Sequence, residues 1–159
     1  MSYQAVILTV SDSCAAGTRT DTSGPAIRAM LENAGFAVQA MQTVPDEEGQ
    51  ISAAIVHACD ILQADLIVTT GGTGLSARDV TPEATLAVLD REIRAIPVAM
   101  WVEGLKSTPR AMLSRAVAGT RGNTLVVNVP GSEKAARENL GAVVATLDHA
   151  LRMLAGGGH

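Results

Sequence analysis

The sequence predicts an α/β fold: a doubly wound, mostly parallel sheet with helices on both faces and one small local hairpin. Apolar residues make up 47% of the 159 residues and aromatic residues only 2%, so the core must consist of small branched side chains, which pack well between a sheet and helices. Nearly continuous apolar runs, typical of buried parallel strands, alternate with segments of helical period. No repeat, linker or low-complexity block interrupts residues 1–155. We therefore expect one domain over 1–155 and a disordered tail at 156–159.

The first elements follow a strand–helix–strand order. Ala5–Val10 is the first predicted strand, and the polar segment Ser11–Thr22 after it is expected to be a loop. Ser23-Gly24-Pro25 predicts the start of a helix that runs to about Ala34, because proline is favoured in a first helical turn. Ala37–Thr43 is the second predicted strand.

The next helix, strand and helix continue the same order. Asp46 is in position to cap a helix with one apolar stripe at helical spacing, formed by Ile51, Ile55, Ala58 and Leu62. Leu66–Thr70 is the third predicted strand, and it leads directly into a glycine-rich loop. Thr81-Pro82 is typical of a capped helix start, and we expect this helix to extend to about Asp90.

The last part of the chain is predicted to hold helices and the hairpin. Pro97–Leu105 and Ala111–Arg115 are expected to be helical. Gly122-Asn123 is a turn signal between Val117–Arg121 and the apolar run Thr124–Val129, which predicts a local hairpin. A final helix follows Pro130-Gly131-Ser132, with an apolar face formed by Leu140, Val144, Leu147, Leu151 and Leu154.

Composition argues against several classes of protein. The net charge is −4 and no basic run occurs, so the electrostatic footprint of a nucleic-acid binder is missing. Cys14 and Cys59 lie in no C-x-x-C or histidine-rich setting, which argues against a zinc site or disulfide framework. No apolar stretch approaches the roughly 20 residues that cross a bilayer, and no leader peptide is discernible. We expect a cytoplasmic protein that binds neither nucleic acid nor membrane.

Ligands of doubly wound sheets bind beyond the carboxyl ends of the strands, so the loops after strands are the candidate site. Ser11 and Asp12 end the first strand on this edge, where they either contact a ligand or cap the loop. Gly71–Gly74 follows the third strand, and three glycines in four residues let backbone N–H groups approach a phosphate. A tight strand-to-helix turn would explain these glycines equally well. The loop from Asn128 to Ser132 opens the last helix, and helix N-termini bind anions.

Two acidic residues in these loops are candidates for a metal site. Asp79 could hold Mg²⁺ on the phosphates of a nucleotide while Arg78 neutralises their charge. The alternative is a solvated pair of surface charges. Asp46 is a second carboxylate on this edge, although an N-cap role would also explain it. Phosphoryl and nucleotidyl transfer need positioning, a metal and charge neutralisation, without a covalent nucleophile.

Several motifs resemble one family along nearly the whole chain. The stretch from Thr69 to Gly74, followed by Arg78-Asp79-Val80-Thr81-Pro82-Glu83-Ala84-Thr85, is similar to the signature of the molybdopterin-binding fold. The shorter motifs that also match are Thr9-Val10-Ser11-Asp12, Asp21 with Ser23-Gly24-Pro25, Val44-Pro45-Asp46-Glu47, Ala111-Met112-Leu113-Ser114-Arg115, Ala118-Gly119 and Asn128-Val129-Pro130-Gly131.

Within that fold the chain resembles the bacterial molybdopterin adenylyltransferases. The resemblance implies that AMP from ATP is joined to the terminal phosphate of molybdopterin, with Mg²⁺ and release of pyrophosphate. It implies catalytic and metal-binding roles for Asp46 and Asp79. The binding positions that it implies, together with those expected above, are Ser11, Asp12, Thr70, Gly71, Gly72, Thr73, Gly74, Arg78, Ser114, Asn128, Pro130, Gly131 and Ser132. It also implies a homotrimer, and a metal-insertion enzyme acting downstream is a further partner compatible with it.

One position departs from the family, since Gly104 replaces a common serine next to Leu105. This departure leaves open whether the chain is a transferase or a non-catalytic molybdopterin-binding protein of the same fold. The presence of Arg78, Pro45 and Asp46 favours the enzyme. A hydrolase or deamidase built on the same fold is the third hypothesis, and no partner domain for it is discernible.

Overall fold

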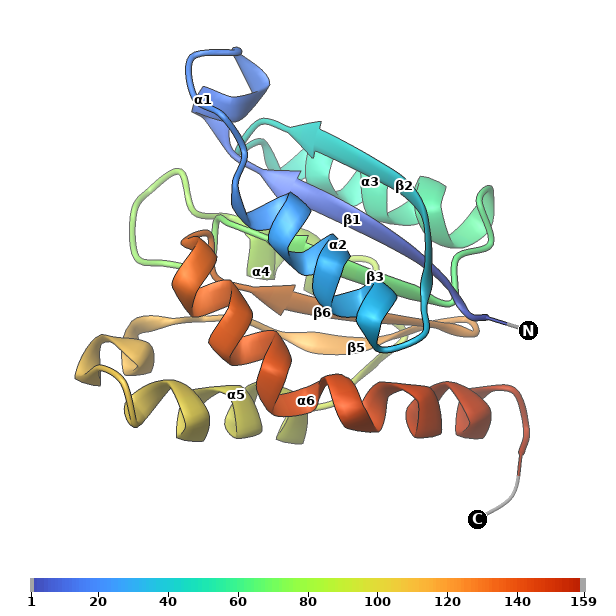
Figure 1. Cartoon of the computed structure of the whole chain (residues 1–159). Helices are drawn as coiled ribbons and strands as arrows, with labels where there is room; N and C mark the ends of the chain where they lie inside the picture. Colours follow the sequence, from blue (N-terminus) through green and yellow to red (C-terminus); the bar gives the residue numbers. More distant parts are fainter. Residues whose placement is uncertain (1, 158–159) are drawn as a thin grey trace.

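The computed structural model describes residues 2–157, which build a mixed six-stranded sheet between two helical layers (Figure 1). The order of strands is β2-β1-β3-β6-β5-β4. The strands are β1 (Gln4–Val10), β2 (Ala37–Val44), β3 (Leu66–Thr70), β4 (Arg91–Glu92), β5 (Ala118–Arg121) and β6 (Thr124–Val129). The helices are α1 (Asp12–Ala15), α2 (Ser23–Asn33), α3 (Glu48–Asp60), α4 (Thr81–Leu86), α5 (Ala95–Leu105), the 3₁₀ helix η1 (Pro109–Leu113) and α6 (Glu133–Leu154).

The four strands β2, β1, β3 and β6 are parallel, and their registers bring their carboxyl ends to one edge. Thr9 of β1 pairs with Thr43 of β2 and with Thr70 of β3, and Thr70 pairs with Val129 of β6. β5 and β4 are antiparallel additions beyond β6. The predicted mostly parallel, doubly wound sheet with a local hairpin is therefore confirmed.

Alternate side chains of the strands enter two separate hydrophobic clusters, because neighbouring residues of a strand point to opposite faces. On one face, Ile7 and Val68 pack with residues of α2, α5 and α6, such as Leu140. On the other face, Leu8 and Ile67 pack with residues of α3 and α4. Figure 1 shows α2 and α6 in front of the sheet, α5 below it beside α6, and α3 and α4 behind it. Branched aliphatic side chains fill both clusters, as the composition requires.

Two predicted helix caps are wrong. α3 begins one residue later than an Asp46 cap would require, with Glu47 at the N-cap position. The Asp46 carboxylate accepts instead from a backbone N–H of the neighbouring loop. Thr81 is the first residue of α4 and not its cap. Its hydroxyl donates to the carbonyl oxygen of Gly71 at 2.9 Å, so it fixes the glycine loop.

Other differences concern short elements and ends. The loop expected at Ser11–Thr22 contains the four-residue helix α1, capped by Ser11. α4 ends at Leu86, and residues 91–92 form the edge strand β4, which the sequence did not predict. In the expected tail, Gly156 and Gly157 donate backbone hydrogen bonds to the end of α6, while 158–159 lie outside the described residues. Over residues 2–157, no helix combines the length and apolarity needed to span a membrane.

Candidate active site

The site lies where the loops that follow β1, β2, β3 and β6 meet. Backbone hydrogen bonds join the strand ends: Ser11 N donates to Val44 O at 3.0 Å, and Gly71 N donates to Val129 O at 3.2 Å. The side chain of Thr70 extends this connection, since its hydroxyl donates to Pro130 O at 2.8 Å. Four segments that are distant in sequence are thereby held at one edge.

The glycine loop after β3 has a conformation that requires glycine at two positions. Gly71 and Gly72 have φ angles of 102° and 68°, which side chains with a β-carbon rarely adopt. A β-carbon on Gly71 would also collide with the carbonyl oxygen of Val10, and one on Gly72 with the hydroxyl of Thr81. These two glycines make a tight turn and also line a cavity. The geometry is therefore compatible with both roles considered for the loop, a strand-to-helix turn and a ligand contact.

Two cavities open at this edge and share a boundary. The larger cavity, of about 770 Å³, lies between the glycine loop, the α5–η1 region and the start of α6. The smaller cavity, of about 320 Å³, lies between the glycine loop and the segment from the end of β1 to the start of α2. Gly72, Asp79, Gly131 and Ser132 line both cavities. Two ligands, one in each cavity, would meet at these four residues.

Asp46 and Asp79 both line the smaller cavity. Burial raises the pKa of Asp46 above its ordinary value of 3.8, and the carboxylates of Asp12 and Asp79 raise it further, against the hydrogen bond from the Asp12 backbone. Asp12 and Asp46 are joined reciprocally, since each backbone N–H donates to the carboxylate of the other at 2.9 Å. This arrangement concentrates negative charge beside the glycine loop.

Arg78 does not point its charge at an open phosphate position. Its guanidinium donates two hydrogen bonds to the Asp12 carboxylate, at 3.0 and 2.9 Å, and a third to Glu47 at 2.9 Å. These partners hold the pKa of Arg78 above its ordinary value and that of Asp12 below its own. Arg78 and Asp12 form a bridge between two loops at the outside of the site, and neither side chain is among those that line the cavities.

The amino end of α6 closes the boundary between the cavities. Ser132 is the N-cap, and its hydroxyl accepts from the backbone N–H of Ala135 at 3.3 Å. The unpaired N–H groups of this 22-residue helix favour an anion at its start. Lys134 lines the larger cavity beside it and adds a full positive charge.

Most of the predicted site residues come together here. Those that line one or both cavities are Ser11, Asp46, Thr70, Gly71, Gly72, Thr73, Gly74, Asp79, Ser114, Pro130, Gly131 and Ser132. Asn128 does not, because its side chain is completely buried. Its amide donates to the hydroxyls of Thr69 and Thr85 and accepts from Val117 N, so it supports the strands below the loops.

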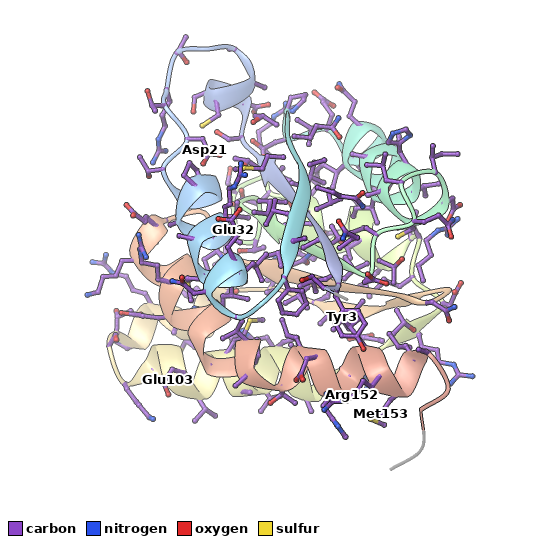
Figure 2. The ribbon with its side chains drawn as sticks, turned by 45° about the vertical axis from the view of Figure 1, so that its right-hand side comes forward. Tyr3, Asp21, Glu32, Glu103, Arg152 and Met153 are labelled. Atoms are coloured by element: carbon purple, nitrogen blue, oxygen red, sulfur yellow. The ribbon has the colours of Figure 1, made fainter. Side chains whose placement is uncertain are left out.

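Other residues of the two cavities were not predicted as site residues. Asp21 lines the smaller cavity and lies at the amino end of α2 (Figure 2). Its carboxylate accepts from the Thr9 hydroxyl at 2.8 Å and from Gly24 N at 3.0 Å. The sequence pointed to Asp21 only through the family motif in which it precedes Ser23-Gly24-Pro25. The wall of the larger cavity also includes residues that were not predicted as site residues: Ser107, Thr108, Arg110, Lys134, Glu138 and Asn139.

The donor set fits a magnesium ion bound together with phosphates. Among the described residues, no three or more His, Cys, Asp or Glu side chains gather into a metal cage. Mg²⁺ on nucleotides is commonly bound by one or two carboxylates plus phosphate oxygens and water. Asp46 Oδ1 lies 3.1 Å from the position of a β-carbon on Gly72, and Asp79 Oδ2 lies 2.9 Å from that on Gly74. Both carboxylates thus flank the loop expected to hold phosphate.

The chain is similar to known proteins in sequence and in fold. A family model described as a probable molybdopterin binding domain matches residues 6–149. A molybdopterin adenylyltransferase from Helicobacter pylori is 36% identical over 154 residues, covering 94% of this chain and 86% of the relative. Gephyrin from Dictyostelium discoideum is 41% identical, covering 93% of this chain and 22% of the relative.

A solved structure from Thermus thermophilus, described as the molybdopterin biosynthesis enzyme MoaB, superposes with a TM-score of 0.92 at 49% identity. The match covers 97% of each chain. The chain spans between about a fifth and a half of the length of the first curated relatives that it matches.

Proposed function

The chain belongs to the family of probable molybdopterin binding domains, and from that membership we propose that it is a molybdopterin adenylyltransferase of molybdenum cofactor biosynthesis. In this reaction an oxygen of the terminal phosphate of molybdopterin attacks the α-phosphorus of ATP. The bond to the leaving pyrophosphate breaks, and adenylylated molybdopterin is formed. Relatives from several bacteria carry the name of this enzyme, and they support the proposal.

The observation that carries the proposal is the shared boundary of the two cavities. The reaction joins two phosphate groups, so both must lie at one place while the remainders of the two molecules extend apart. Gly72, Gly131 and Ser132 offer backbone and helix-terminus donors at that place, and Asp79 lies beside them. A carrier of one ligand needs no second cavity, which favours the enzyme over the non-catalytic alternative.

Asp46 and Asp79 are the side chains that would hold Mg²⁺ against the phosphates. The bound ion supplies charge stabilisation for the transferring phosphoryl group. No covalent nucleophile on the protein is required, because positioning and electrostatic stabilisation account for most of the catalysis of such transfers. Asp12 orients Asp46 through the reciprocal pair of hydrogen bonds, and the Arg78 bridge holds Asp12.

We further propose that the protein assembles as a homotrimer and acts in the cytoplasm, where ATP is available, before a metal-insertion enzyme. Exposed apolar side chains support an assembly through α5 and η1: Val98, Val102, Leu105, Met112 and Leu113. Within residues 2–157, the indole N–H of Trp101 in α5 is buried without a hydrogen-bond acceptor. A subunit contact at this helix would cover the exposed apolar side chains and could supply a hydrogen-bond acceptor for the Trp101 indole.

The experiment that tests the function is an assay of the purified protein with ATP, Mg²⁺ and molybdopterin. Pyrophosphate release and adenylylated molybdopterin should appear in equal amounts, and omission of molybdopterin should abolish both. Binding of molybdopterin without pyrophosphate release would favour the non-catalytic alternative and overturn the proposal.

A further inference from the structure

The loop 74–79 carries Asp79 to the cavity boundary, yet few contacts attach this loop to the rest of the molecule. Residues 75–78 are all exposed. Three hydrogen bonds fold the loop on itself: Ser76 N donates to Asp79 Oδ2 at 3.0 Å, Asp79 N donates to Ser76 O at 2.9 Å, and Arg78 N donates to the Ser76 hydroxyl at 3.4 Å. Such internal bonds shape the turn but cannot fix where the turn lies above the sheet.

One guanidinium group holds both ends of this loop. Arg115 Nε donates to the carbonyl oxygen of Gly74 at 2.8 Å, and its Nη2 donates to the carbonyl oxygen of Asp79 at 2.7 Å. The backbone N–H of Arg115 donates to Thr73 O at 2.8 Å, so the segment that carries the arginine is itself attached to the glycine loop. The planar guanidinium presents several donors in a fixed geometry, and a lysine ammonium does not.

A third contact fixes the guanidinium from the other side. Nη1 of Arg115 pairs with the carboxylate of Glu83 in α4, which packs against the sheet. The arginine thus connects the helix after the loop with both ends of the loop. Arg115 lines neither cavity, but Ser114 beside it lines the larger one, and Asp79 lines both.

We propose that Arg115 is a positioning residue for adenylyl transfer, which holds loop 74–79 so that the Asp79 carboxylate stays at the boundary of the two cavities. This inference rests on the proposed function. Arg115 touches no substrate in this scheme and acts through Asp79. Loss of the clamp would leave the loop attached to the remaining body mainly through the exposed Arg78 bridge.

The variants that test the proposal are Arg115→Ala and Arg115→Lys, with Arg121→Ala as the matched control. Arg121 also pairs with a carboxylate, Asp60, and donates to a backbone carbonyl, that of Val88, but it lies at the opposite edge of the sheet. Arg115→Ala should lower kcat on the order of 10²-fold, the scale of a displacement of about 1 Å in a catalytic group. KM should change far less than kcat. Arg115→Lys should recover only part of this loss, because an ammonium keeps the charge but cannot bind both carbonyls as the fork does.

Two further measurements separate positioning from a merely structural role. Free guanidinium ions should restore part of the kcat lost in Arg115→Ala, and should not restore Asp79→Asn. Hydrogen exchange of the amides of Ser76 and Asp79 should become faster in Arg115→Ala, while exchange in β1 and β3 stays as in the wild type. The Arg121→Ala variant should show neither effect.

Wild-type kcat in Arg115→Ala, or faster exchange that spreads equally over the whole sheet, would overturn the proposal. So would a loss of activity in Arg121→Ala equal to that in Arg115→Ala. A wild-type protein that transfers no adenylyl group would overturn the proposed function instead. The exchange measurement needs no turnover, so it would still decide whether Arg115 holds the loop.

Discussion

At the scale of single residues, Asp46 and Asp79 lie in one cavity but are held differently. Asp79 accepts from the backbone N–H of Ser76, and Asp46 accepts from that of Asp12. Both donors are backbone groups, which an amide oxygen could engage as well as a carboxylate oxygen. A change to asparagine therefore removes charge with little change of shape, and it separates electrostatic from structural roles.

Asp79→Asn should lower turnover by roughly 10²-fold or more, the scale of losing one preorganised electrostatic group. The melting temperature should stay near that of the wild type. Steady-state kinetics at saturating Mg²⁺ with a thermal melt would check both. Asp148→Asn, which changes an exposed carboxylate paired with Arg152 on α6, is the control. Near-normal turnover of Asp79→Asn would remove Asp79 from the metal site.

The raised pKa of Asp46 predicts a pH dependence of activity. Mg²⁺ binds the ionised carboxylate, so kcat/KM should decrease as the pH is lowered and Asp46 becomes protonated. Because the pKa of Asp46 is raised, this decrease should begin at a higher pH than for a carboxyl group with the ordinary pKa of 3.8. Higher Mg²⁺ concentrations should move this acid limb to lower pH, because the ion competes with the proton. Profiles at two Mg²⁺ concentrations test this, and an acid limb that does not respond to Mg²⁺ would contradict it.

The same pKa shift fixes the sign of the effect on stability. A carboxyl whose pKa is raised by folding contributes most to stability below its unfolded pKa, and this contribution is lost as the pH rises through the folded pKa. The free energy of unfolding of Asp46→Asn should therefore not decrease as the pH rises through the pKa of Asp46. At neutral pH this variant should be at least as stable as the wild type but less active. Denaturant unfolding at acid and neutral pH would measure the difference.

At the scale of elements, the glycine loop after β3 separates two kinds of glycine. Gly72 has a φ of 68°, and a β-carbon there would collide with the Thr81 hydroxyl. Gly74 has no positive φ, and its β-carbon would meet the Asp79 carboxylate at 2.9 Å. The turn requires glycine at position 72, whereas glycine at position 74 leaves room for the Asp79 carboxylate.

Gly72→Ala should therefore lower the free energy of unfolding by about 1 kcal/mol or more. Gly74→Ala should keep the melting temperature and lose activity, because Asp79 must move. Thermal melts and turnover of both variants form the comparison. Gly74→Ala with unchanged turnover would show that the position of Asp79 tolerates this displacement.

The elements also show what the sequence alone can predict. The strands β1, β3 and β6 were predictable because each is a mainly apolar, buried segment bounded by turn signals. β2 was also predicted, although Gln39, Gln42 and Thr43 interrupt its apolar residues. β4 has two exposed residues and no pattern, and it exists because β5 offers an edge. The sequence around Asp46 predicted a helix cap because only its neighbours in the chain could be considered. Its actual hydrogen bonds are to Asp12, 34 residues away, and local patterns cannot predict such a contact.

The predicted site has the same limit. Loops at the carboxyl ends of parallel strands could be grouped from the order of elements, so the sequence could place the glycine loop and the two acids at one edge of the sheet, where they line the cavities. The clamp of Arg115 depends on contacts with loop 74–79 and α4, which are distant in sequence. The wall formed by Arg110, Lys134 and Asn139 depends on how α5, η1 and α6 pack together. Packing between helices leaves no local signal in the sequence.

At the scale of the whole molecule, the exposed apolar face of α5 predicts the assembly. Val98, Val102 and Leu105 lie on one face at helical spacing, each between 45% and 57% exposed. Sedimentation at micromolar concentration should show three chains, and Val102→Glu should shift the mass to that of one chain. Ile61→Glu, at an exposed apolar position after α3, should leave the mass unchanged. A wild-type monomer would contradict the assembly.

The pairing of β3 with β6 has a consequence for how the protein is made. β3 ends at Thr70 and β6 begins at Thr124, so during synthesis the edge of β3 stays open until more than fifty further residues have been added. An open apolar strand edge is a template for association with other chains. α6, which packs on the hydrophobic cluster that contains Val68 of β3, is synthesised after β6. The edge of β3 can therefore be covered, and the sheet completed, only after residues 124–129 have been synthesised.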